Sequence, residues 1–270
     1  MRILLAAVAA IFAATLAGSF AAAAQPAPSP AVLKDLAPTG KLRAAINYGN
    51  NVLAQKGPNG EPRGVSVDLA AALAKRLGVP VEYVPFQAAG KSFEAVANGT
   101  VDVGYIAIDP VRAEKADFTA PYAVIEGTYM VPKDSALKDV GDVDRPGVRI
   151  GIGLASVYDL YLTRVLKNAT LVRAKVGGAS AGIPVFVEGK LEAAAGVRQA
   201  LDAYAKDHPE VRVMTGAFQQ IRQAMTTPKG RPAGLAYLKA FVEEMKASGF
   251  VADGLKRSGM GEVAVAPPEK

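Results

Sequence analysis

The chain has 270 residues, no cysteine, one histidine, and a formal net charge of +6 from 31 Lys and Arg against 25 Asp and Glu. The lack of cysteine excludes disulfides, thiolate nucleophiles, iron–sulfur clusters and cysteine zinc sites. The basic residues are scattered singly among acids, without the clustered charge that nucleic-acid binding requires, so we expect no nucleic-acid partner.

The N-terminal segment is predicted to lie outside the fold. An uncharged apolar run over residues 3–20 follows a positive start and leads into Ala22-Ala23-Ala24. This order is typical of a secretory signal peptide, predicted over residues 1–24, with a membrane anchor helix as the alternative. Because no cysteine follows to carry a lipid, we expect a freely diffusing periplasmic protein. The Pro-rich residues 25–37 are predicted to be an extended linker.

Strands and helices alternate through the first half of the remaining chain. Asp68 is predicted to cap a helix that ends at Gly78, and Pro110 to open another helix at its first position. The other predicted elements are strands at 42–47, 81–86 and 101–108 and a short helix at 91–98. Such an alternation favours an α/β fold with a largely parallel sheet.

The same order of elements restarts in the second half. A strand at 148–152 precedes a helix that Ser156 is predicted to cap, and the sequence at 96–102 is echoed at 186–192, where each segment joins a helix end, a glycine, an aliphatic residue and an acid. The two glycines are 90 residues apart, which indicates two similar lobes. The final predicted elements are a strand at 221–228 and helices at 233–248 and 251–258. His208 lies in a polar turn, which favours an exposed loop histidine over a member of a Ser-His-Asp triad.

Arg112 is the first candidate ligand-binding residue. It falls in the first turn of the helix that follows the strand ending at Ile108, where ligands of open parallel sheets bind. A cation there opposes the helix dipole, and a bound carboxylate would offset the repulsion by contacting both the helix N–H groups and the guanidinium. The alternative is an ion pair with a neighbouring acid such as Asp109 or Asp117.

Four segments in order and spacing resemble the family 3 extracellular solute-binding proteins, the amino-acid-type receptors of ABC importers. The segments are Gly64-Val65-Ser66-Val67-Asp68-Leu69, Gly99-Thr100-Val101-Asp102-Val103, Pro110-Val111-Arg112 and Asp117-Phe118-Thr119-Ala120-Pro121-Tyr122. The resemblance covers about residues 40–260. It implies a type II periplasmic-binding-protein fold with the ligand in a cleft between two lobes, and an inner-membrane ABC permease as partner.

The resemblance also implies lobe boundaries and ligand contacts. Lobe 1 is expected over 38–129 plus 224–262, lobe 2 over 130–223, and a C-terminal tail over 263–270, with crossings near Thr128–Val131 and Phe218–Ala224. Arg112 is expected to grip a carboxylate of the ligand, with help from Ser156 at the start of the first helix of lobe 2. By position after the first strand, Asn47, Tyr48, Asn50 and Asn51 are expected to contact the ligand, although a turn built on Asn and Gly49 explains them too.

Two departures from the family pattern concern the ligand's amine. The usual Thr or Ser three residues before the arginine is Asp109, which suits a helix N-cap or would accept hydrogen bonds from the ligand. At the position where the family usually has an acid that holds the ligand's amine, this chain has Val197. The next residue, Arg198, is either a second cationic contact to the ligand or a solvated surface residue. A buried unpaired ammonium is costly, so either Asp109 takes over or the ligand is not a standard α-amino acid.

The predicted function is therefore a monomeric periplasmic binding protein for a small carboxylate-bearing solute, without cofactor or metal. Two rival readings concern other classes of protein. A glycine loop at 151–156 resembles a dinucleotide site but lacks the third glycine and the later acid. A periplasmic dehydratase on the same scaffold would need a cleft acid of raised pKa; Glu126 or Asp109 are candidates, but nothing in the sequence marks either as a general acid. A ligand-sensing receptor subunit is a third possibility.

Overall fold

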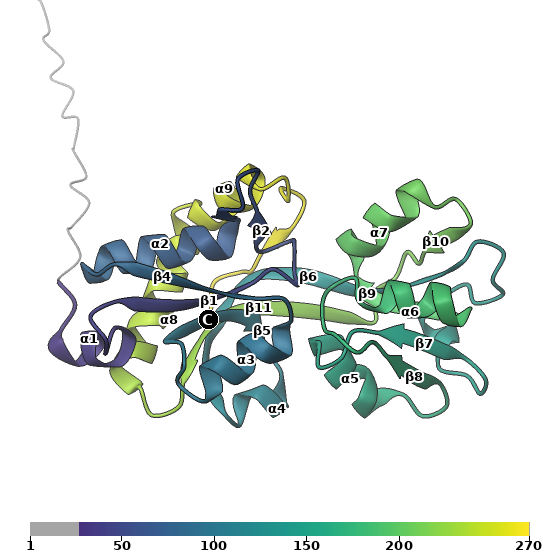
Figure 1. Cartoon of the computed structure of the whole chain (residues 1–270), viewed down its shortest axis with the longest axis horizontal. Coiled ribbons are helices and arrows are strands. Elements are labelled where there is room, and N and C mark those ends of the chain that lie inside the picture. Colours follow the sequence, from purple (N-terminus) through teal and green to yellow (C-terminus); the bar gives the residue numbers. More distant parts are fainter. Residues whose placement is uncertain (1–26, 270) are drawn as a thin grey trace, which may run out of the picture.

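The computed structural model describes residues 27–269, so the predicted signal peptide lies outside the described residues. Two α/β lobes lie side by side and share one sheet, in the strand order β4-β1-β5-β11-β6-β9-β7-β8 (Figure 1). The α/β, two-lobed architecture predicted from the sequence is confirmed. Within residues 27–269 no helix is long and apolar enough to cross a membrane.

Lobe 1 is built on the parallel strands β1 (Leu42–Asn47), β4 (Val81–Phe86) and β5 (Val103–Ala107), with helices α2 (Val65–Leu77), α3 (Ala89–Ala97) and α4 (Pro110–Ala113). A two-stranded hairpin of β2 (Gln55–Lys56) and β3 (Pro62–Arg63) precedes α2. The helix predicted to start at Asp68 begins one turn earlier, directly after Gly64. That glycine has φ +111°, and an added Cβ would lie 2.6 Å from the carbonyl oxygen of Leu53, so the chain turns into the helix where only glycine fits.

Lobe 2 repeats the arrangement with β7 (Arg149–Ile152), β8 (Thr170–Arg173) and β9 (Ala193–Val197). Its helices are α5 (Val157–Val165), α6 (Gly182–Gly189) and α7 (Arg198–Asp207), with a 3-10 turn η1 (Val140–Val143) and the edge strand β10 (Val211–Val213). Ser156 caps α5 as the sequence predicts, because its Oγ accepts a hydrogen bond from the Asp159 N–H at 3.0 Å.

The internal echo in the sequence corresponds to one ion pair made twice. In lobe 1 the Nε and Nη2 of Arg43 on β1 donate to both carboxylate oxygens of Asp102, at 2.9 and 2.7 Å. In lobe 2 the Nε and Nη2 of Arg149 on β7 donate to both oxygens of Glu192, at 2.9 and 2.8 Å. Each pair fastens the acid before one strand to the start of its neighbour, and the two lobes therefore share one construction.

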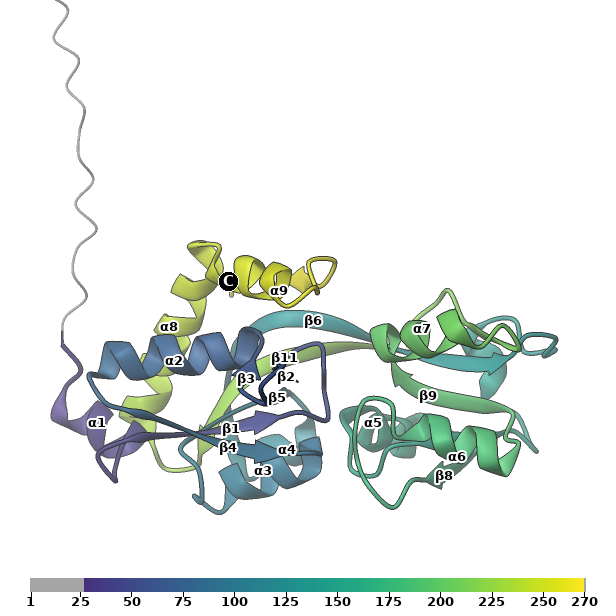
Figure 2. The same ribbon diagram turned by 45° about the horizontal axis from the view of Figure 1, so that its top comes forward.

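Two antiparallel strands run between the lobes, β6 (Ala116–Pro132) and β11 (Gln219–Pro228) (Figure 2). β6 pairs with β11 from Ala116 to Gly127 and with β9 of lobe 2 from Gly127 to Met130. One strand thus belongs to the sheets of both lobes, and the chain changes lobe without leaving the sheet.

Both ends of the described chain pack on lobe 1. The predicted linker contains the helix α1 (Pro30–Leu36), which buries Val32 and Leu36 and contacts α8 (Pro232–Ala247), where the Gly234 N–H donates to Asp35 at 2.8 Å. After α9 (Phe250–Arg257), the predicted tail forms β12 (Ala264–Val265), which pairs with β6. Both departures have one cause, because each segment carries apolar side chains that the lobe buries.

Candidate functional site

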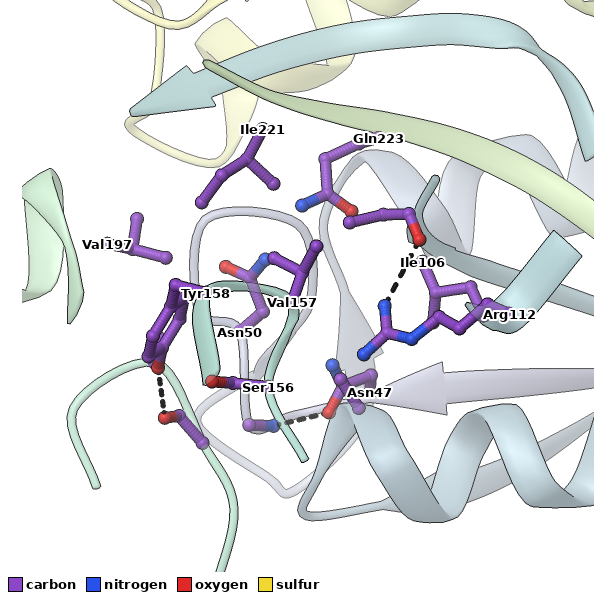
Figure 3. Close-up of a pocket in the computed structure, with 15 residues that line it drawn as sticks. Asn47, Asn50, Ile106, Arg112, Ser156, Val157, Tyr158, Val197, Ile221 and Gln223 are labelled. Atoms are coloured by element: carbon purple, nitrogen blue, oxygen red, sulfur yellow. Dashed lines mark hydrogen bonds between the residues drawn. The ribbon is translucent and has the colours of Figure 1, made fainter. Parts of the chain in front are cut away.

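A pocket lies between the lobes, where the carboxyl ends of β1, β5 and β9 meet the start of α5 (Figure 3). Strand ends of this kind are where ligands of open α/β sheets bind. Both lobes and the crossing strand β11 supply side chains. The lining residues are Asn47, Gly49, Asn50, Ala89, Ile106, Ala107, Arg112, Ser156, Val157, Tyr158, Gly178, Ala179, Val197, Ile221 and Gln223.

Arg112 on α4 is the one charged residue in this lining and is 1% exposed. Its guanidinium donates to two backbone carbonyls, Ala107 of lobe 1 and Ala155 of lobe 2, each at 3.1 Å, and lies 5.9 Å from the ring centre of Phe93. Burial lowers the pKa of Arg112 to about 10, so the group is still cationic at neutral pH. The charge of the nearby Asp109 opposes this lowering, but Asp109 forms its ion pair with Arg164, and within residues 27–269 Arg112 forms no ion pair of its own.

The start of α5 brings hydrogen-bond donors to the same pocket from lobe 2. Ser156 uses an oxygen lone pair to cap the helix, and its side chain also hydrogen-bonds the Tyr158 hydroxyl, which opposes the rise in the Tyr158 pKa caused by burial. Val157 and Tyr158 are the first two residues of α5, whose N–H groups have no partner within the helix. The buried Tyr158 hydroxyl donates to the Gly178 carbonyl at 2.6 Å, and this bond holds the pocket wall.

Three amide side chains complete the polar part of the lining. Asn47 at the end of β1 is buried, and its Oδ1 accepts from the Gly49 N–H at 3.0 Å, which leaves its NH₂ group as donor. Asn50 uses its Oδ1 in the same way, to the Val52 N–H at 3.3 Å. Gln223 on β11 is 3% exposed and points into the pocket (Figure 3).

Asp109 does not line this pocket. Its carboxylate caps α4 by accepting from the Val111 N–H at 2.9 Å, as one of the two sequence readings predicts, and it pairs with Arg164 of lobe 2 at 2.7 Å. Asp109 is 1% exposed, so the pair joins the lobes at a buried point. Ile108 lies just past β5 outside the lining, whereas Ile106 of the same strand lies inside it.

Val197 ends β9, lines the pocket and is 3% exposed. Arg198, the next residue, turns away. Its Nε pairs with Glu126 at 2.5 Å and its Nη1 donates to the Met214 carbonyl at 2.9 Å. Arg198 therefore connects the start of α7 to β6 and to the segment that follows β10. Of the two sequence interpretations of Arg198, neither the ligand grip nor a freely solvated side chain describes this arrangement.

Tyr48 and Asn51 also lie outside the lining. The Tyr48 N–H continues the β1–β4 ladder by donating to Phe86 at 2.8 Å, and Asn51 is exposed. Asn50, expected with them to contact the ligand, does line the pocket, whereas sequence reasoning missed Tyr158 and Gln223. The signal for Gln223 was present, because it lies in the predicted return strand two residues after the apolar Ile221 and therefore on the same face of that strand.

The lobes touch around the pocket. The Ala179 N–H of lobe 2 donates to the Gly49 carbonyl of lobe 1 at 2.6 Å. Gly90 at the start of α3 lies so near lobe 2 that an added Cβ would be 2.9 Å from the Cβ of Ala155, whose own φ is +55°. These contacts describe two lobes closed on each other, with the pocket between them.

Two α/β lobes joined by crossing strands, with a pocket lined from both, define a two-lobed solute-binding protein. The chain belongs to the bacterial extracellular solute-binding proteins, family 3, whose model matches residues 42–257. The resemblance noted in the sequence is thereby confirmed. A search of the curated proteins found no match.

Solved structures with the same fold include three that indicate the range of relatives. The ancestral amino acid-binding protein AncCDT-1, a precursor of cyclohexadienyl dehydratase, is 26% identical with a TM-score of 0.69, over 83% of this chain and 97% of that one. An ancestral arginine-binding protein bound to glutamine is 25% identical with a TM-score of 0.68, over 82% and 98%. The L-cysteine solute receptor of Neisseria gonorrhoeae is 23% identical with a TM-score of 0.71, over 84% and 92%.

Proposed function

We propose that the protein is the periplasmic receptor of an ABC importer and captures a small carboxylate-bearing solute between its lobes. The observation that carries the proposal is the buried guanidinium of Arg112, which faces the pocket and forms no ion pair among residues 27–269, since the nearby Asp109 is paired with Arg164. An unpaired buried charge is costly, and a ligand carboxylate would supply the missing anion.

Capture by closure follows from where the donors come from. Arg112 belongs to lobe 1, while Ser156 and the first amides of α5 belong to lobe 2. A carboxylate between them would be held by both lobes at once and would favour the closed form over the open one. The permease would then recognise the closed, monomeric receptor.

Export is the second part of the proposal. The predicted signal peptide would be removed after residue 24, and the mature chain would begin at or within a residue or two of Gln25. N-terminal sequencing of the protein from a periplasmic fraction tests this. A mature chain that still starts at Met1 would sink the export proposal.

A ligand screen by thermal unfolding tests the binding function. Amino acids, dicarboxylates, aromatic acids and simple aliphatic carboxylates are each added to the wild type and to Arg112→Ala. A true ligand at 100 times its Kd stabilises the native state by roughly 2.7 kcal/mol, and this stabilisation should be absent from the variant. Uncharged analogues of the same shape should not stabilise either protein.

The scaffold could instead carry a dehydratase, since one similar structure is described as a precursor of such an enzyme. A general acid needs a raised pKa. Of the two acids considered, Asp109 caps a helix and pairs with Arg164, and the hydrogen bond from Arg198 lowers the pKa of Glu126. These arrangements favour a receptor. Incubation with prephenate-like acids decides the question, because product formation would identify an enzyme.

A further inference from the structure

The charges around the pocket are one-sided. Its lining holds one cation, Arg112, and no acid, and the amide side chains of Asn47 and Asn50 keep their NH₂ groups as donors. A carboxylate matches this set at one end. For an ammonium group on the same ligand the lining offers no carboxylate, and the Oδ1 atoms of Asn47 and Asn50 are committed to backbone N–H groups, which leaves the neutral amide oxygen of Gln223.

The acids nearest the pocket are each engaged elsewhere. Asp159 is 4% exposed, and its two oxygens accept from the Ala155 N–H and from Arg173, both at 2.9 Å. Asp109 serves the α4 cap and Arg164, and Glu126 serves Arg198 and Gln220. Releasing one of these carboxylates for a ligand would leave its arginine partner without an anion.

Val197 is the residue that lobe 2 presents instead. It ends β9 directly at the pocket, and with Ile221 and Val157 it gives the pocket an apolar wall opposite Arg112 (Figure 3). An α-ammonium against this wall would lose its water without gaining an ionic partner, whereas a methylene or methyl group there would be stabilised by burial.

We propose that this pocket selects monocarboxylates that lack an α-amine and whose remainder is uncharged, and that Val197 is the specificity-determining residue. The inference rests on the proposed carboxylate-binding function and makes it narrower, because it separates this chain from the amino-acid receptors to which it is similar.

Calorimetry on matched pairs tests the proposal with the wild-type mature protein. The pairs are alanine and propionate, leucine and 4-methylpentanoate, and phenylalanine and 3-phenylpropionate. In every pair that binds, we expect the deaminated acid to be the tighter ligand, by tenfold or more. An amino acid that binds more tightly than its deaminated partner would overturn the proposal.

A second test isolates the charge at position 197. Val197 is the N-cap of α7 and makes no side-chain capping bond, and both Asp and Asn suit that position, so neither substitution should disturb the helix. Val197→Asp should shift the preference toward the amino acid by at least tenfold relative to the uncharged control Val197→Asn. Equal preferences in the two variants would show that position 197 does not determine specificity.

Failure of this inference is distinguishable from failure of the proposed function. If amino acids bind more tightly and Arg112→Ala abolishes that binding, the receptor stands and the amine-free class is wrong. If no member of any pair binds but a dicarboxylate or another acid of the screen stabilises the wild type and not Arg112→Ala, the receptor stands and the monocarboxylate class is wrong; if nothing in the screen does so, both proposals fall.

Discussion

Burial of the Arg112 guanidinium costs free energy that its contacts within the protein offset only in part. Its two carbonyl acceptors satisfy N–H groups but supply no negative charge. The nearby Asp109, which is paired with Arg164, offsets the desolvation of the guanidinium only in part, and the proposed ligand carboxylate would offset more of it when the lobes meet. The same reasoning explains why the residue lies at the boundary between the lobes.

Replacing Arg112 by Ala should weaken binding of any carboxylate found in the screen by roughly 2–5 kcal/mol, as is usual when one member of a buried charge pair is removed. Titration calorimetry measures the loss. The matched control is Arg222→Ala, because Arg222 lies on β11 beside Gln223 but is exposed. Binding of the Arg112 variant within a few-fold of the wild type would assign the guanidinium a structural role.

At the scale of the elements, the duplicated ion pairs of the two lobes differ in their surroundings. The Asp102 side chain is fully buried and also accepts from Arg231 at 3.0 Å, whereas the Glu192 side chain is 37% exposed. Solvent screens the Arg149–Glu192 pair and cannot reach Asp102, so the two equivalent ion pairs contribute different amounts to the free energy of unfolding.

Asp102→Asn should therefore lower the free energy of unfolding by about 3 kcal/mol, because the guanidinium groups of Arg43 and Arg231 lose a buried anion. Glu192→Gln should cost about 1 kcal/mol or less. Urea denaturation of both variants at neutral pH compares them. Equal losses would mean that the duplicated pairs carry the same weight in spite of their different burial.

For the whole molecule, closure depends on close approach between α3 of lobe 1 and the start of α5 in lobe 2. Gly90 permits that approach, and no strained backbone angle requires glycine there, since its φ is not in the left-handed region. Asp109 and Arg164 add an ion pair across the same boundary. Solvent weakens its contribution to closure, because the arginine side chain is 37% exposed.

Gly90→Ala should accordingly separate binding from stability. Alanine favours the helix by up to about 1 kcal/mol, so the ligand-free protein should unfold at the same temperature or higher, while ligand affinity falls because the lobes no longer meet. Small-angle scattering should show a ligand-induced fall in the radius of gyration for the wild type and a smaller one for the variant. Gly141→Ala is the control, because an added Cβ there meets nothing within 4 Å.

Much of this architecture could be predicted from the sequence. The bounds of β1 and β4 match the predicted strands, and the capping role of Ser156 followed from its position before an apolar face. The residues that line the pocket were harder to predict than the strands, because hydrophobic periodicity indicates which face of a strand is buried but not how the loop after it turns. Of the two asparagines Asn50 and Asn51, both expected at the ligand, only Asn50 enters the lining for that reason. The partners of Asp109 and Arg198 come from segments 55 and 72 residues away, which no local pattern reports.

The position of β11 has a consequence for how the chain acquires its structure. β11 lies in the middle of the sheet, between β5 and β6, yet it is the next-to-last strand in the chain. Lobe 2 is complete in sequence before β11 begins, whereas lobe 1 lacks a central strand until residue 219 is available. If the chain becomes available from its N-terminus onward, all strands of lobe 2 are therefore present before lobe 1 has its last central strand. Until then, β5 and β6 of lobe 1 lack the strand that lies between them. During that time lobe 1 would expose the most apolar surface to chaperones that bind unfolded chains.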